Sequence, residues 1–353
     1  MPAPAQLTLE YTPSSRCDAV DLRSRLDERL GSALAGYRKA LYCSHHTTAG
    51  FLDRHVGQRL RHRRDLFDFI GAFQTIFPEN ADYKHDALHL RTELSEEQRA
   101  TEPRNADSHL TFISAGMHNC VTYDTDDDRP VYMVDLDGVH EHGARRRKAS
   151  IVAYTDDQAV VSTELEVPVS NHPIDSINVF DEELGLTDQL DDLIRRHGVE
   201  KGRLDISLAD DETSASITVN EFETLLMKND LRDVLRDPLR FMRERGRDLL
   251  RDPRALPQKT FGYAQYDLVQ ILNELVEAVG VSESILEKLL ARLIALPASR
   301  LLGVRRSVSL LVSDQGNGSG AIVKGMYQSP ILMQWRKSER QSRRLTASLS
   351  SFS

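Results

Sequence analysis

The stretch His45-His46-Thr47-Thr48-Ala49-Gly50 opens a series of short motifs that the chain carries twice. In the first series it is followed by Arg64-Asp65-Leu66, Pro78, Tyr83-Lys84-His85-Asp86, Ser108-His109-Leu110 and Gly143-Ala144-Arg145-Arg146. The second series keeps the order and the rough spacing, with Glu212-Thr213-Ser214-Ala215-Ser216, Arg247-Asp248-Leu249, Pro257, Gln265-Tyr266-Asp267, Ser299-Arg300-Leu301 and Gln341-Ser342-Arg343-Arg344. Such a repeat predicts two copies of one module, which we place at residues 1–155 and 156–353.

The bulk composition sets limits on the class of protein. A chain of 353 residues can bury two cores, and 40% hydrophobic with 28% charged residues is typical of a soluble globular protein. The net charge of −9 argues against a nucleic-acid partner, which would require a concentrated basic face. Three cysteines form a sparse, odd set, which excludes a disulfide scaffold and a cysteine zinc cage. Without an apolar signal core or a membrane-spanning run, we expect a cytoplasmic protein with no membrane partner.

The hydrophobic periodicity predicts an α+β fold in which each module has a largely antiparallel sheet and packed helices. Strands are predicted at 6–11, 40–43, 111–113, 120–123, 131–136 and 149–153, and in the second module at 159–169, 204–208, 307–313, 321–327 and 331–335. Helices are predicted at 18–34, 60–76, 182–197, 222–250 and 268–296. The Ser-rich tail 346–353 is predicted to be frayed.

The first module is rich in histidine at positions that the repeat would bring together. His46 follows a predicted strand, His85 follows a turn and His109 precedes a predicted strand. Three neutral imidazoles from different elements are a common ligand set for zinc with one open position. No two of these three histidines are four residues apart, the spacing that brings two ligands to one face of a helix. The alternative therefore stays open that they are unrelated histidines, either on the surface or hydrogen-bonded in the core.

Two arginine pairs end the two series, at Arg145-Arg146 and Arg343-Arg344. An arginine that follows a glycine turn beside a histidine cluster can hold a phosphate group with two parallel hydrogen bonds. An exposed edge strand protected by charge would have the same sequence. Both interpretations stay open at this point.

Taken in order, these motifs resemble the YjbQ-like family, whose members are often described as secondary thiamine-phosphate synthases. The resemblance covers residues 1–153 with its histidine motifs and extends more faintly over 160–350, through the runs 213–221 and 324–328. It implies an α+β module that assembles as a trimer and has histidines lining a pocket for a metal or phosphate. It also implies a weak thiamine-phosphate-forming transferase activity. Two modules per chain would give six modules in a trimer.

The two copies depart from the family pattern in complementary ways. The first keeps the histidines, whereas the second keeps an acid and an amide at Asn220-Glu221 and Tyr327-Gln328. One hypothesis is a single composite site per chain, in which His46, His85 and His109 bind a divalent metal, zinc above all. Glu221 and Gln328 would complete it, with Glu221 as general base or additional ligand. The alternative is independent decay, which leaves the second copy as scaffold.

The leading function is therefore a metal-dependent enzyme that acts on a phosphorylated small molecule. The metal and Arg146 would stabilise developing phosphate charge. The alternative is a non-catalytic protein that binds a metal or metabolite, or that serves as an assembly scaffold. We expect a homo-oligomer in either case.

Overall fold

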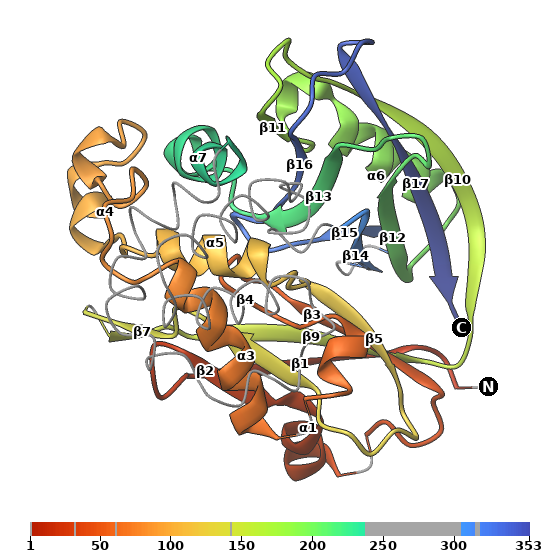
Figure 1. Ribbon diagram of the computed structural model, residues 1–353. Helices are drawn as coiled ribbons and strands as arrows, with labels where there is room; N and C mark the ends of the chain where they lie inside the picture. Colours follow the sequence, from red (N-terminus) through yellow and green to blue (C-terminus); the bar gives the residue numbers. More distant parts are fainter. Residues whose placement is uncertain (1, 32, 61, 142, 237–304, 315–317) are drawn as a thin grey trace, which may run out of the picture. The chain divides into compact units, whose positions relative to one another are not determined.

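The computed structural model describes residues 2–31, 33–60, 62–141, 143–236, 305–314 and 318–353. These residues fall into two compact units. Figure 1 shows the helices and strands coloured along the sequence. The first unit consists of Met1–Arg59, Met117–Phe222 and Arg305–Ser353, and the second of Leu60–Gly116 and Glu223–Val304. Each unit takes segments from both halves of the chain. The division into successive modules at 1–155 and 156–353 stays a prediction.

The first half of the chain gives the first unit two sheets. The larger has the strand order β1-β9-β3-β5 and the smaller β2-β6-β4. The strands are β1 (Ala5–Tyr11), β2 (Asp18–Asp21), β3 (Lys39–Ser44), β4 (Ala49–Gly50), β5 (Cys120–Asp124), β6 (Tyr132–Asp135) and β9 (Arg147–Tyr154), with the hairpin β7 (Val139–His140) and β8 (Gly143–Ala144). The helices of this part are α1 (Leu22–Leu30) and α2 (Arg54–Gly57).

The second half repeats this topology within the same unit. Its larger sheet has the order β10-β17-β12-β14, extended by β15, and its smaller sheet has the order β11-β16-β13. These elements are β10 (Asp157–Pro168), β11 (Asp175–Asn178), η2 (Glu182–Leu184), α6 (Leu186–Arg196), β12 (Lys201–Leu208), β13 (Ala215–Asn220), β14 (Ser307–Asp314), β15 (Gly320–Val323), β16 (Ser329–Gln334) and β17 (Ser342–Phe352). In both halves the last strand lies between the first and third. A duplication as the origin of this repeated order stays a prediction.

Every pairing between the named strands of the described residues is antiparallel, so the predicted α+β class with largely antiparallel sheets is confirmed. Strand β12 buries alternate residues, among them Leu204, Ile206 and Leu208, whereas β13 and β16 are buried along their whole length. Apolar side chains of both halves meet in one cluster, where the rings of Tyr154 and Phe352 stack with centroids 3.9 Å apart. An aromatic pair of this kind contributes about 0.5–1.5 kcal/mol beyond its buried area.

The predicted frayed tail is wrong. Residues Ser342–Phe352 form β17, which pairs with β10 on one side and β12 on the other. Leu345, Ala347 and Leu349 alternate along it and are fully buried. Serine content indicated a loose end, but this period-two apolar pattern decides the outcome because it fits the inner face of a sheet.

The described part of the second unit is helical. It contains α3 (Arg63–Ile76), η1 (Leu88–Leu90), α4 (Glu96–Thr101), α5 (Ala106–Ser114), the π-helical turn η3 (Leu226–Asp230) and α7 (Leu231–Arg236). The strand predicted at 111–113 is wrong, because these residues end α5. All nine residues of α5 are buried, so tertiary packing overrides the β-propensity of its Thr-Phe-Ile run. The helix predicted at 268–296 lies outside the described residues.

No helix in the described part of the chain has both the length and the apolar character needed to cross a bilayer.

Candidate functional site

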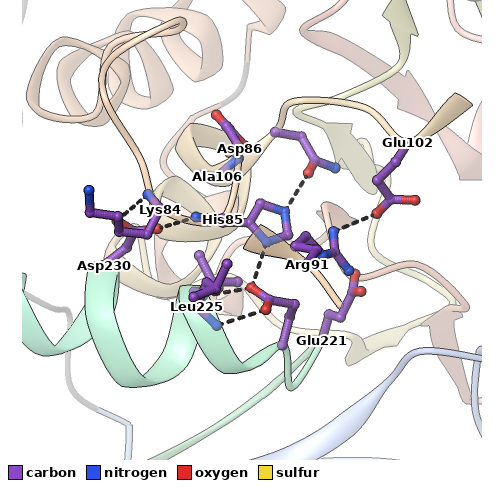
Figure 2. A network of polar contacts seen from close by, with 12 residues as sticks. Lys84, His85, Asp86, Arg91, Glu102, Ala106, Glu221, Leu225 and Asp230 are labelled. Carbon is purple, nitrogen blue, oxygen red and sulfur yellow. Dashed lines mark hydrogen bonds and ion pairs between the residues drawn. The ribbon is translucent and has the colours of Figure 1, made fainter. Parts of the chain in front are cut away.

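His85 lies at the centre of a buried polar cluster in the second unit (Figure 2). It belongs to the segment between α3 and η1, and 1% of its surface is exposed. Its Nδ1 lies 2.9 Å from Glu223 Oε2, and its Nε2 lies 3.1 Å from Asn105 Oδ1. Because both neighbouring atoms are acceptors, a protonated ring donates a hydrogen bond from each nitrogen.

Glu223 stands immediately before the helical segment that contains η3 and α7. Its Oε1 accepts the N–H of Leu225 at 2.7 Å, and its Oε2 accepts the N–H of Leu226 at 2.7 Å. The carboxylate thus caps the first turn of the helix, where backbone N–H groups have no intrahelical partner and the helix dipole favours negative charge. The Glu223 carboxylate thus lies within hydrogen-bond distance of three nitrogens, the backbone N–H groups of Leu225 and Leu226 and Nδ1 of His85.

Asp230 fixes the main chain of the same segment. It is fully buried in η3, and its carboxylate accepts the N–H groups of Lys84 and His85 at 2.9 Å each (Figure 2). The backbone and the ring of His85 are therefore both held by residues of the 223–230 segment.

The two ionisable groups of the pair favour each other's charged form. Burial alone would raise the pKa of Glu223, but the hydrogen bonds from His85 and from two backbone N–H groups outweigh it and lower that pKa. Burial likewise opposes protonation of His85, yet the hydrogen bond to Glu223 raises its pKa above the ordinary value. The surroundings of the pair therefore favour a carboxylate at Glu223 beside an imidazolium at His85.

Further ion pairs hold the loop around His85. The Arg91 side chain is 4% exposed and lies 2.7 Å from Glu93 Oε1 and 2.9 Å from Glu102 Oε1 (Figure 2). Asp86 accepts the N–H of Ala106 at 3.1 Å, which ties the loop to the start of α5. These contacts fix the position of His85 from its own side of the cluster.

His109 lies within α5 and is as deeply buried as His85. Their ring centroids are 5.4 Å apart and the rings meet edge to face at 77°. The structure thus brings together two of the three predicted metal-binding histidines.

The residues around His85 do not fit a zinc-type ligand set. A metal ligand needs an imidazole nitrogen lone pair, whereas both nitrogens of His85 face protein acceptors and its pKa is raised. Within the described ranges, no group of three or more His, Cys, Asp or Glu side chains is arranged to hold a metal ion.

His46 belongs to the first unit and follows β3. Its Nε2 accepts the backbone N–H of Lys148 at 2.8 Å. Burial, with the neighbouring charge of Arg147 next in size, lowers its pKa to about 3, so the ring is neutral at pH 7. One of its two nitrogens is occupied by the backbone of β9.

Glu212 takes the equivalent place in the second half. Its carboxylate accepts the N–H of Arg344 at 3.0 Å and lies 2.7 Å from Nη1 of the buried Arg343. Ala49 pairs with Asp135 and Ala215 pairs with Gln334, which aligns the two segments as the motifs predicted.

The predicted equivalence of Arg145-Arg146 with Arg343-Arg344 is out of register by two residues. Arg147, not Arg145, is the buried counterpart of Arg343: its Nε and Nη2 bind Asp135 at 2.5 and 2.6 Å. The guanidinium of Arg147 also donates to Asp137 O, and that of Arg343 donates to Arg336 O.

Gln328 holds the His45-His46 segment through its main chain. Its Nε2 donates to Ser44 O at 3.0 Å and His46 O at 2.8 Å, and its Oε1 accepts the N–H of Gly325 at 2.8 Å. A Cβ at Gly325 would lie 1.9 Å from His45 O, so this turn requires glycine. Gln328 is thus brought to His46, as predicted, but it binds the peptide carbonyl and not the ring.

The other two predicted site residues also belong to the first unit. The side chain of Arg146 is 77% exposed and pairs with Glu10. Glu221 follows β13, is partly buried, and donates its N–H to Asn220 Oδ1 at 2.8 Å. Their roles as phosphate ligand and general base stay predictions.

Sequence reasoning missed Glu223, Asp230 and Asn105, the three residues that surround His85. Glu223 and Asn105 each precede a helix, a position where acidic or amide side chains signal a helix start. That signal could have located the helices. It could not have identified the histidine as their partner, because the contacts to Glu223 and Asp230 span 138 and 145 residues.

No family model matches this chain, and no curated protein does. Among solved structures, a YbjQ-like protein of unknown function from Sulfolobus solfataricus is 15% identical, covers 56% of this chain and 99% of its own, and gives a TM-score of 0.30. A hypothetical protein from Aeropyrum pernix is also 15% identical, with coverages of 55% and 99% and a TM-score of 0.29.

A third structure, an uncharacterised protein of the YjbQ family from Clostridium acetobutylicum, is 16% identical, covers 42% of this chain and 98% of its own, and has a TM-score of 0.27. These descriptions agree with the family resemblance that the motifs predicted. Likeness at this identity concerns the fold alone.

Proposed function

We propose that this chain is a non-catalytic scaffold protein, in which the His85–Glu223 pair joins two segments far apart in the sequence. The observation that carries the proposal is the complete pairing of His85. Both ring nitrogens and the backbone N–H have protein partners at 2.9–3.1 Å.

The chemistry of the pair supports this proposal over a catalytic role. A general base needs a free lone pair within hydrogen-bond reach of a substrate, and a metal ligand needs a neutral imidazole. Both ring nitrogens of His85 already face protein acceptors and Glu223 already accepts three hydrogen bonds, with side chains 1% and 5% exposed. A satisfied pair of this kind contributes conformational specificity, because alternative packings would leave its charges unpaired.

The metal-dependent reaction on a phosphorylated small molecule, implied by the family resemblance, is the competing function. Metal content of the purified full chain, measured by inductively coupled plasma mass spectrometry, separates the two. We expect less than stoichiometric metal in the wild type, in His85→Ala and in the control His89→Ala, since His89 is exposed in η1.

One metal ion per chain in the wild type and in His89→Ala, lost from a folded His85→Ala variant, would overturn the proposal. Light scattering during size-exclusion chromatography tests the assembly role. The expected species is a homo-oligomer, predicted as three chains, and a monomer would remove the assembly part of the proposal.

A further inference from the structure

Arg305 is held firmly by its backbone in the first unit. Its carbonyl accepts the N–H of Ile217 at 3.1 Å and the hydroxyl of Ser216 at 2.9 Å, and its own N–H lies 3.2 Å from Ser216 Oγ. These three contacts to β13 fix the point from which the side chain extends.

The guanidinium of Arg305 is not compensated by these contacts. Its Nη2 is buried and has no hydrogen-bond partner among the residues that the structure describes. Burial lowers the pKa of Arg305 to about 9, and the carboxylate of Asp53 opposes this only in part. A buried cation without a bonded counter-ion is costly, so such a group favours the arrival of an anion.

His118 lies in the electrostatic field of Arg305. It is fixed by reciprocal backbone hydrogen bonds with Phe51, at 2.8 and 2.6 Å, and its Nε2 is 3.7 Å from Asp53 Oδ2. Burial first, and then the positive charge of Arg305, hold the pKa of His118 well below the ordinary value. Its side chain is 22% exposed and that of Asp53 49%, so solvent reaches this cluster.

We propose that Arg305, together with His118, forms a binding site for a small oxyanion, either a phosphate group or a carboxylate. A guanidinium presents parallel N–H donors whose spacing matches two oxygens of either anion. The anion would supply the partner that Nη2 lacks. It would also favour a proton on His118, which gives the site a second donor. Asp53 lies 3.7 Å from His118 and acts electrostatically on Arg305, so its negative charge weakens anion binding.

Isothermal titration of the full-length chain with inorganic phosphate, at constant ionic strength, tests the site. We expect saturable binding of one phosphate per chain, weakened at least tenfold in Arg305→Gln. The matched control is Arg195→Gln, which removes the same charge from a side chain that is 59% exposed and paired with Asp192. Sulfate and acetate in separate titrations distinguish a preference for a tetrahedral oxyanion from one for a carboxylate.

A stability measurement guards against a trivial loss of binding. Removal of an uncompensated buried charge should leave Arg305→Gln folded and melting no lower than the wild type, with no further rise in Tm when phosphate is added. Phosphate should raise the Tm of the wild type and of Arg195→Gln. Absence of phosphate binding by the wild type, unchanged binding by Arg305→Gln, or a fall in the Tm of that variant would each overturn the proposal. All three readouts are independent of the metal content that tests the scaffold function.

Discussion

Substitution Glu223→Gln removes the charge of the buried pair with almost no change in shape. The side chains of His85 and Glu223 are 1% and 5% exposed, so solvent does not screen their interaction. Loss of one partner from a buried ion pair costs about 3–5 kcal/mol, because the remaining charge stays desolvated. We expect Glu223→Gln to lower the free energy of unfolding by at least about 3 kcal/mol, since the amide oxygen can replace only one of the two acceptor oxygens and the NH2 group would face a donor.

The assay must report on the second unit. The only tryptophan, Trp335, lies in the first unit, so far-UV circular dichroism in urea and hydrogen exchange of peptides spanning 83–91 and 223–236 are the suitable measurements. Glu93→Gln is the matched control, because that carboxylate is 53% exposed and its pair with Arg91 should contribute less than about 1 kcal/mol. A decrease in the free energy of unfolding below about 1 kcal/mol in Glu223→Gln, or one equal to that of Glu93→Gln, would refute the stabilising role of the buried ion pair.

The pair also predicts a pH window. The pKa of His85 is raised above 6.5 in the folded protein. Its contribution to the free energy of unfolding is therefore complete below pH 6.5 and is lost as the pH rises through the raised pKa. The pKa of Glu223 is lowered below 4.5, so its contribution is present above pH 4.5 and is lost as the pH falls through the lowered value. The stability difference between wild type and Glu223→Gln should therefore be largest between about pH 4.5 and 6.5. A difference that stays constant into the alkaline range would count against a charged His85.

Three further outcomes follow from single positions. Gly325→Ala should lower thermal stability by about 1–3 kcal/mol, because the new Cβ would lie 1.9 Å from a backbone oxygen; unchanged melting would contradict the close approach. Gly71→Ala, in α3 with nothing within 4 Å of the new Cβ, should raise stability by about 0.5–1 kcal/mol, and a loss in the same melts would contradict that open space. The pKa of His46, lowered to about 3, predicts wild-type stability that is complete above pH 6.5 and falls below it by at most about 1.4 kcal/mol per pH unit. Urea titrations from pH 7 to 4 should give a shallower fall for His46→Gln, and identical slopes would exclude a buried neutral His46.

Much of the first unit could be predicted from local pattern. The apolar run 40–43 located β3 to within one residue at each end, and the run 204–208 located β12 to within three residues; β12 shows the alternate burial of a strand with one inner face. Alternation of the same kind at Leu345, Ala347 and Leu349 predicts β17, whereas the serine content of the tail predicts a frayed end. At α5 the local pattern is misleading. The Thr-Phe-Ile run favours a strand locally, and the helix forms because all of its residues are buried by tertiary packing.

The sequence by itself determined that two similar series of motifs occur in one order, and that His46 and Glu212 occupy equivalent places. Both conclusions depend on residue type and spacing, which are local properties. Only the tertiary structure decided that His85 faces Glu223 and Asp230, more than 130 residues further along the chain. The charge of an imidazole depends on its burial and on its partners, and neither is encoded in the spacing around it. For this reason the sequence could single out a histidine as important, whereas the fold assigned it to a buried ion pair.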